Sequence, residues 1–198
     1  MEKTDDLKLI HDAKRGSGAA LNALFERYGS KLLVLIRLRM GPSLRRRLES
    51  RDVLQQTMLK AFQRIDQFGG QGETTMMAWL GAIARHELQD QAKFFGRGGR
   101  DAKQDVPIEA VGDVALEPLR TEISRLHLVA RVQQLEQAID ALDHDHREVV
   151  LLRRFEEMSF PEIGVHLGKS PDASRMLYSR AMASLTLKLR QIEGAGAA

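Results

Sequence analysis

Positive charge is concentrated between residues 168 and 190, where Asp172 is the only carboxylate. The cations in this segment are Lys169, Arg175, Arg180, Lys188 and Arg190. Arginine and lysine bind the phosphate oxygens of nucleic acids, and an arginine can also donate two parallel hydrogen bonds to guanine in the major groove. The chemistry open to this segment is therefore nucleic-acid recognition, although the same charges would serve equally well as the solvated face of a surface helix.

The residues around these cations carry the start and stop signals of two consecutive helices. Residues 159–162 (SFPE) form a capping box with proline in the first turn, which predicts a short helix over 160–167. Gly168 can adopt the left-handed conformation that ends such a helix. Residues 170–171 (SP) then predict a longer helix that runs from 171 to about 190. A short helix, a glycine turn and a longer helix form the pattern of a helix-turn-helix.

The longer helix divides into two faces at the helical period. The face expected to point inward holds Ser174, Leu177, Tyr178, Ala181 and Leu185. The face expected to point outward holds Asp172, Arg175, Met176, Ser179 and Arg180. The predicted DNA contacts are Lys169, Ser170, Arg175, Met176, Ser179 and Arg180. Among these, Arg175 is placed to read a base, while Arg180 and Lys169 are placed to hold phosphates.

No set of residues predicts catalysis or a bound metal. The chain contains no cysteine, which excludes disulfides, thiolate nucleophiles and cysteine-ligated metal sites. No Ser/His/Asp arrangement and no inward-facing carboxylate pair emerges from the helical patterns. Residues 144–146 (HDH) have no third or fourth ligand nearby, so solvated histidines are expected there. We therefore predict that the protein is not an enzyme and needs no cofactor.

Helical spacing of apolar residues extends over most of the remaining chain. The expected helices cover about residues 17–35, 50–65, 74–94 and 128–142. Residues 96–99 (GRGG) are expected to end the third of these helices, and the last five residues are expected to be disordered. The sequence thus predicts an all-α fold of two small helical domains joined by a flexible linker, the C-terminal domain being the helix-turn-helix.

The distribution of charge divides the chain in the same way. Residues 1–100 hold 18 Lys and Arg against 11 Asp and Glu, residues 101–124 hold 2 against 6, and residues 125–198 hold 10 against 10. The acidic middle segment also contains two prolines, and such a composition buries little apolar surface. We predict domains at residues 1–100 and 123–198, joined by an acidic, protease-sensitive linker over 101–122.

Nothing in the sequence predicts insertion into a membrane. The N-terminus lacks the apolar core of a signal peptide. The longest wholly apolar run, Leu32–Ile36, is far shorter than the ~18 residues that span a bilayer. We expect a cytoplasmic protein.

The C-terminal part of the chain resembles region 4 of the bacterial sigma-70 family, in its small extracytoplasmic-function (ECF) group. Residues 142–153 (LDHDHREVVLLR) look like the helix that precedes the helix-turn-helix of that family. Residues 158–168 (MSFPEIGVHLG) look like its first helix-turn-helix element, and residues 174–181 are similar to its recognition helix.

The N-terminal half carries an independent resemblance to region 2 of the same family. Residues 52–58 (DVLQQTM) resemble the region 2 signature, and residues 78–85 (AWLGAIAR) resemble the helix that follows it. The positions that depart from the family pattern are Gln56, His86, Ser174 and the loop 69–75. These departures leave the expected fold unchanged, but the family's promoter sequence preference does not carry over.

The resemblance implies a sigma factor that directs promoter recognition and transcription initiation. In the family, region 2 binds core RNA polymerase and opens the −10 promoter element, and region 4 binds the −35 element as duplex. The implied partners are core RNA polymerase and promoter DNA, with room for an anti-sigma factor. The implied polymerase contacts are Asp52, Gln55 and Gln56. The implied contacts with the DNA backbone are Arg85, Gln89 and Lys93, which recur every four residues.

Two other functions remain open. One is an operator-binding regulator, which would use the helix-turn-helix as a dimer and bind DNA without polymerase. The other is a helical adaptor, which would bind polymerase without starting transcription. The first half does not resemble a ligand-sensing or dimerisation domain, which disfavours the regulator, whereas nothing in the sequence excludes the adaptor. We also predict that the two domains can pack together in the free protein and mask DNA contacts.

Overall fold

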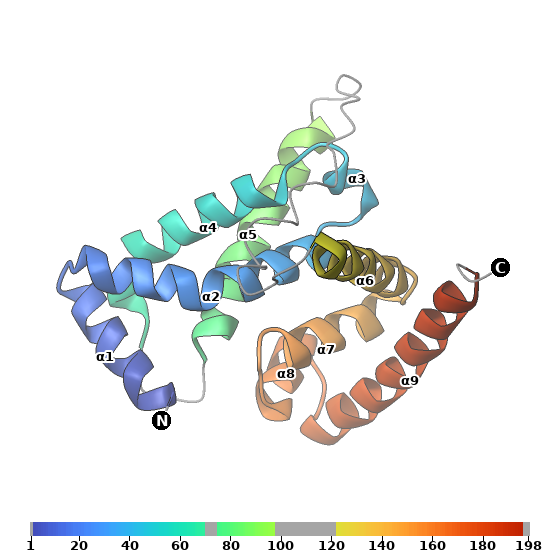
Figure 1. The fold of residues 1–198 in the computed structure, drawn as a ribbon. Helices are drawn as coiled ribbons and strands as arrows, with labels where there is room; N and C mark the ends of the chain where they lie inside the picture. The colour runs from blue at the N-terminus through green and yellow to red at the C-terminus, as the bar shows by residue number, and fades with distance from the viewer. Residues whose placement is uncertain (1, 70–74, 98–121, 196–198) are drawn as a thin grey trace.

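The structure is a computed structural model that describes residues 2–69, 75–97 and 122–195. Every regular element within these ranges is a helix, which confirms the all-α prediction (Figure 1). Residues 101–121 of the predicted linker and most of the loop that follows Gly69 lie outside the described residues.

The N-terminal half is built around one long buried helix. Its elements are α1 (Glu2–Lys14), α2 (Gly18–Arg39), α3 (Pro42–Arg45), α4 (Ser50–Gln63), the 3-10 turn η1 (Ile65–Gln67) and α5 (Met76–Arg97). Helix α2 contacts α1, α4 and α5. Its most deeply buried side chains, each at most 1% exposed, are Leu32, Leu33, Leu35, Ile36 and Leu38. A helix that is apolar on several sides is stable only when other helices surround it, as they do here.

Residues 122–195 of the C-terminal half form four helices. They are α6 (Glu122–Asp140), α7 (His144–Arg154), α8 (Phe160–Leu167) and α9 (Pro171–Ala195). Helix α9 packs against α6, α7 and α8. The buried side chains that join them include Val149, Leu152, Ile163, Ala181 and Leu185.

Helices α2 and α7 each begin at a side-chain cap, Ser17 and Asp143 respectively. The Ala20 N–H donates to Ser17 Oγ at the start of α2, at 3.3 Å. The His146 N–H donates to Asp143 Oδ1 at the start of α7, at 2.9 Å. A side-chain oxygen that accepts from the first turn stabilises a helix by about 1 kcal/mol, so local chemistry determines these starts.

Some helix ends lie beyond the predicted positions. Helix α5 continues past Phe94 to Arg97, which lies inside the glycine-rich stretch 96–99 that was predicted to end it. Helix α9 continues to Ala195, so the first residues of the tail predicted to be disordered are helical. One glycine disfavours a helix by only about 1 kcal/mol relative to alanine, which is too little to end a helix whose other residues favour it.

The two halves of the chain meet along α2. Helices α6 and α7 both contact α2, and buried apolar side chains of the two halves form one continuous cluster (Figure 1). Arg37 of α2 and Glu136 of α6 add a buried ion pair across the boundary, with Nε and Oε1 2.6 Å apart. Arg45 of α3 pairs with Asp140 at the end of α6. The halves are therefore closed against each other in this structure.

Candidate nucleic-acid interface

Helix α8 and the turn that follows it are held by local hydrogen bonds. At the start of α8 the Ser159 N–H donates to Glu162 Oε2 at 2.7 Å, and the Glu162 N–H donates to Ser159 Oγ at 3.4 Å. Gly168 ends the helix with φ +64°, as predicted. The Lys169 N–H then donates to the Gly164 carbonyl at 2.8 Å. The predicted capping box and glycine turn are therefore both confirmed.

Gly164 allows α8 to approach the backbone at the start of α9. A Cβ atom at this position would lie 2.6 Å from the Lys169 carbonyl oxygen and 3.4 Å from the Pro171 nitrogen. Backbone atoms in a tight turn cannot move aside as the end of a side chain can. Glycine is therefore required for this close approach.

We expect Gly164→Ala to lower the free energy of unfolding by about 1–3 kcal/mol, the usual cost of forcing extra atoms into a packed site. Gly194→Ala is the control, because nothing lies within 4 Å of that position in α9. The control should be neutral or slightly stabilising, since alanine favours helix over glycine. Urea unfolding followed by circular dichroism measures both variants. Equal stability of the two would contradict the packing described for this turn.

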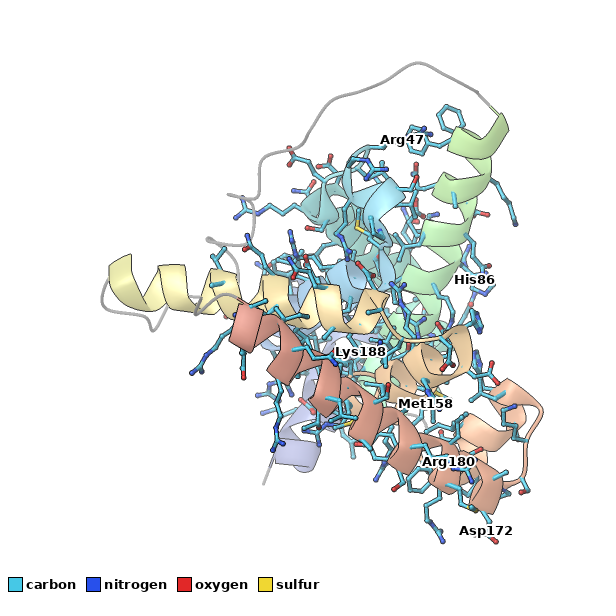
Figure 2. The ribbon with its side chains drawn as sticks, turned by 90° about the vertical axis from the view of Figure 1, so that its right-hand side faces the viewer. Arg47, His86, Met158, Asp172, Arg180 and Lys188 are labelled. Atoms are coloured by element: carbon cyan, nitrogen blue, oxygen red, sulfur yellow. The ribbon has the colours of Figure 1, made fainter. Side chains whose placement is uncertain are left out.

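Helix α9 has the two faces that the sequence predicted. Its buried residues are Ser174, Ala181 and Leu185, with Leu177 and Tyr178 half-buried beside them. Its exposed residues over the first turns are Asp172, Arg175, Met176, Ser179 and Arg180. Figure 2 shows this helix from Asp172 near its N-terminal end, past Arg180, to Lys188. The exposed face is thus available to a ligand in the closed structure.

Arg175 is exposed on this face, yet an ion pair and an aromatic ring hold its side chain in place. Its side chain is 65% exposed, and Nη1 lies 3.2 Å from Asp172 Oδ1. Its guanidinium also lies over the Phe160 ring, 5.5 Å from the centroid, and Arg153 lies over the same ring at 5.0 Å. Stacking on an aromatic ring holds a guanidinium in place while its N–H donors stay available. Arg153 did not belong to the predicted set of DNA contacts.

Lys169 and Ser170 lie in the turn that leads into α9. Lys169 Nζ is 3.1 Å from Asp145 Oδ2. The hydrogen bond from Lys169, followed by that from His144, holds the pKa of the Asp145 carboxyl below its ordinary value. Ser170 Oγ accepts from the Ala173 N–H at 3.2 Å, as predicted for the helix cap. An exposed ion pair contributes little to stability, so Lys169 can exchange this carboxylate for another anion.

The face of α4 predicted to bind polymerase is exposed. Asp52, Gln55 and Gln56 lie on its solvent side, while Leu54 and Met58 are buried on the opposite side. In Figure 1 this helix lies on the other side of α2 from α9. The two candidate surfaces could therefore engage different partners at once.

The structure does not bring the three predicted residues of α5 into one exposed stripe. Gln89 and Lys93 are exposed, and Lys93 Nζ lies 3.8 Å from Asp90. Arg85 instead donates to Glu156 in the other half, with Nη1–Oε1 and Nη2–Oε2 both at 3.3 Å. Burial lowers the pKa of the Arg85 guanidinium, and Glu156 opposes this effect. The expectation of a continuous free stripe is corrected here, because the packing of the halves covers its first member.

Glu156 is the centre of an ionic cluster between the halves that sequence reasoning did not find. Its side chain is fully buried, and Oε1 also accepts from Arg39 Nε at 3.1 Å and Nη2 at 2.5 Å. Arg39 Nη1 in turn donates to both oxygens of Glu148, at 3.0 and 3.1 Å. A signal for this cluster was present in the sequence. Arg37 and Arg39 interrupt an apolar stretch, and cations on a buried helix require partners.

The part of the chain that the structure describes holds no cluster of three or more potential metal ligands. His144 and His146 lie beside carboxylates instead, with Nδ1 3.5 Å from Asp145 and 2.8 Å from Asp143 respectively. Among the same residues, no helix combines the length and the apolar character needed to cross a membrane.

The helix-turn-helix segment matches a known protein family. Residues 132–185 match the family described as Sigma-70, region 4, and this segment contains α7, α8 and the exposed face of α9. RNA polymerase sigma factor NccH of Alcaligenes xylosoxydans xylosoxydans is 28% identical over 190 residues, which are 93% of this chain and 95% of the relative. The ECF RNA polymerase sigma-E factor of Escherichia coli strain K12 is 26% identical over 196 residues, 96% of this chain and 97% of the relative.

A solved structure extends the likeness to three dimensions. The structure of CnrH in complex with the cytosolic domain of CnrY matches with a TM-score of 0.58 at 26% identity. The match covers 94% of this chain and 97% of the other, so it includes both helical halves. Over nearly its whole length the chain is therefore similar to RNA polymerase sigma factors, among them an extracytoplasmic-function (ECF) factor.

The segment that matches sigma-70 region 4 thus contains the helices that form the helix-turn-helix. Helices α1 to α5 lie within the length aligned with full relatives, since those alignments cover more than nine-tenths of each chain. The residues on which the region 2 resemblance depends, 52–58 and 78–85, lie on α4 and α5. The residues that resemble region 2 therefore lie on exposed and buried faces of two packed helices.

Proposed function

We propose that this chain is an RNA polymerase sigma factor that binds core polymerase and directs it to the −10 and −35 elements of promoters. The observation that carries the proposal is the exposed face of α9, with Arg175 and Arg180 on a helix-turn-helix inside the region 4 match. Relatives along most of the chain are RNA polymerase sigma factors, including the sigma-H factor of Pseudomonas aeruginosa, which is 28% identical over 168 residues. Initiation of transcription in a reconstituted system tests the proposal directly.

In this proposal three segments of the chain have different roles. Residues 1–100 bind the polymerase clamp and the −10 element. Residues 101–122 connect the domains, and residues 123–198 bind the −35 element. The charge supports this division, because the two DNA-binding segments are basic or neutral while the connector is acidic.

Region 4 would read the −35 duplex with the N-terminal half of α9 in the major groove. Arg175 presents a guanidinium fork that suits guanine O6 and N7. Met176 offers an apolar contact and Ser179 a hydroxyl that can donate or accept. Lys169, Ser170 and Arg180 flank these residues and would contact phosphates, which positions the helix without adding sequence information.

In region 2, α4 would bind core polymerase and α5 would bind DNA. The exposed face of α4, with Asp52, Gln55 and Gln56, would contact core polymerase. Gln89 and Lys93 of α5 would follow the DNA backbone. Arg85 would join them once its contact with Glu156 is released.

In this role the chain acts in the cytoplasm, where transcription takes place, and performs no reaction of its own. It needs no cofactor and no metal ion. CnrH, which is similar over nearly its whole length, is solved together with the cytosolic domain of CnrY. We therefore include an inhibitory partner of the anti-sigma kind among the partners of this chain.

Replacing Lys169 by alanine should weaken holoenzyme binding to all −35 sequences alike. A contact with a phosphate carries no base information, and its loss should reduce the slope of log affinity against log salt by about 1. Fluorescence anisotropy with labelled duplexes, at salt concentrations from about 50 to 200 mM, measures this slope. Lys8→Ala, on the exposed side of α1, is the control and should leave the slope unchanged. A sequence-dependent loss would contradict the phosphate assignment.

A further inference from the structure

Two arginines of the N-terminal half direct their guanidinium groups at one carboxylate of the C-terminal half. Arg85 of α5 binds both oxygens of Glu156, each at 3.3 Å. Arg39 of α2 binds Oε1 through Nε at 3.1 Å and Nη2 at 2.5 Å, and its side chain is only 5% exposed. The N-terminal half thus forms a two-arginine anion site, and the C-terminal half supplies the anion.

Separation of the halves would leave both arginines without their carboxylate partners. In the closed structure burial lowers the pKa of the Arg85 guanidinium, and the nearby charge of Arg39 lowers it further. Glu148 lies on α7, so it would leave Arg39 together with Glu156. Two exposed guanidinium groups in this arrangement present planar donor forks, which bind phosphate as readily as carboxylate.

The position of the site indicates which anion replaces the carboxylate. Arg85 is the first member of the column that continues along α5 with Gln89 and Lys93, each one helical turn further. Both of these residues are exposed in the closed structure. A chain of phosphodiester groups that follows this column would reach Arg85 next. DNA is therefore the anion that the geometry favours.

We propose that Arg39 and Arg85 form a binding site for a DNA phosphodiester group, which the Glu156 carboxylate fills in the closed structure, so that closure and DNA binding at this site exclude each other. The proposal rests on the proposed function for the assignment of the α5 column to DNA. It adds Arg39 as a DNA-binding residue and Glu156 as an internal competitor of DNA.

The backbone and the neighbouring helix are shaped to hold Glu156 in this site. A Cβ atom on Gly81 of α5 would lie 2.6 Å from Glu156 Cδ and 2.9 Å from Oε2, so only glycine leaves room for the carboxylate. Glu157, the next residue, has φ +60°, a conformation that disfavours residues other than glycine. Thr75 Oγ1 donates to the Glu156 carbonyl at 3.0 Å. Such strain persists only where surrounding contacts hold it in place.

The exclusion has a measurable consequence for the free chain. Apparent affinity for DNA is reduced in proportion to the fraction of molecules that are open. Glu156→Gln removes the charge but keeps the size of the side chain, so it should raise the open fraction. If closed molecules outnumber open ones about ten to one, the variant binds DNA about tenfold more tightly than the parent.

The first measurement is the affinity of the full-length chain, without polymerase, for a fluorescein-labelled DNA of mixed sequence with an unpaired segment. Opening is followed in parallel by energy transfer between dyes on cysteines introduced at Lys8 and Glu193, which is straightforward because the chain has no cysteine of its own. We expect Glu156→Gln to bind DNA more tightly and to increase the distance between the dyes. Unchanged affinity would overturn the proposal.

A second substitution separates an anion site from a purely structural ion pair. Arg39→Gln, introduced into the Glu156→Gln chain, should weaken DNA binding about fivefold and lower the salt slope by about one phosphate contact. If Arg39 and Glu156 only held the halves together, removing Arg39 from an already open chain would leave DNA affinity unchanged. That result would overturn the assignment of Arg39.

Gly81→Ala provides a test that changes no charge. The added methyl group occupies the space of the Glu156 carboxylate, so this variant should also open the chain and bind DNA more tightly. If Glu156→Gln does not fold cooperatively, the DNA affinity of Gly81→Ala decides the proposal instead. The proposed function is tested separately, because transcription by the holoenzyme can fail while these DNA affinities change as expected. Conversely, active holoenzyme with unchanged DNA affinities would overturn the anion site alone.

Discussion

Reversing the charge of the exposed face of α4 should reduce affinity for core RNA polymerase by about a hundredfold, which corresponds to roughly 2.7 kcal/mol. The change is the double substitution Asp52→Lys and Gln56→Lys. Lysines here would repel the cations that the Asp52 carboxylate attracts, and like charges placed together at an interface cost several kcal/mol. Both residues are exposed, so the free energy of unfolding should change little. Competition against a labelled sigma factor for core enzyme measures the affinity.

The control for this experiment places the same charges elsewhere on the surface. Asn22→Lys and Glu26→Lys lie four residues apart on the exposed side of α2, and they change the net charge by the same amount. This control should bind polymerase as the parent does. Equal loss in both double variants would indicate a general charge effect, and no loss in either would remove α4 from the polymerase interface.

Replacing Arg175 by alanine should remove the base preference at one position of the −35 element. A bidentate arginine–guanine contact contributes about 1–3 kcal/mol of discrimination against the wrong base, roughly a factor of 5 to 150 in relative affinity. Stability should change little, since the ion pair with Asp172 is exposed. Selection of holoenzyme-bound sequences from a randomised −35 pool measures the preference at every position.

Two further variants sharpen this prediction. Arg175→Lys keeps the charge but not the planar fork, so it should lose the base preference while retaining more affinity than alanine. Arg190→Ala removes an exposed cation further along the same helix and should keep the parental preference. If the Arg175 variants select the parental sequence at every position, a different residue of α9 reads the bases.

The helix-turn-helix could be predicted from the sequence because its determinants are local. The capping box at Ser159 and Glu162, the left-handed Gly168 and the cap at Ser170 each act within four residues. The two faces of α9 followed from the helical period alone. For the same reason the candidate residues on α4 and α9 were placed on exposed faces, where the structure has them.

The need of the buried arginines for partners could be read from the sequence, but which residues pair with them could not, because the members of the ionic cluster are far apart in the chain. Arg85 and Glu156 are 71 residues apart, and Arg39 and Glu156 are 117 apart. Helical periodicity places each of these residues on a face but does not say which faces meet. The unbroken polar stripe expected on α5 failed at Arg85 for this reason. The end of α5 is a local feature instead, and it lies within the predicted glycine-rich stretch 96–99.

The closed arrangement connects the two regions of the proposed sigma factor. The surfaces predicted for polymerase and for the −35 element are exposed while the halves are packed. Arg85 of α5, by contrast, is covered by its ion pair with Glu156. Binding to polymerase could therefore begin in the closed form, and contact with the −10 strand would require the halves to separate.

Run-off transcription with purified core RNA polymerase tests the central claim most directly. The template is a pool of linear DNAs with randomised −35 and −10 elements, and transcripts are sequenced to recover the promoters used. We predict that the chain, added to core enzyme, produces run-off transcripts from a subset of templates that share a −35 and a −10 sequence, and that Asp52→Lys with Gln56→Lys abolishes them. A chain that binds core enzyme yet yields no transcript above core alone would be an adaptor, and that result would contradict the account.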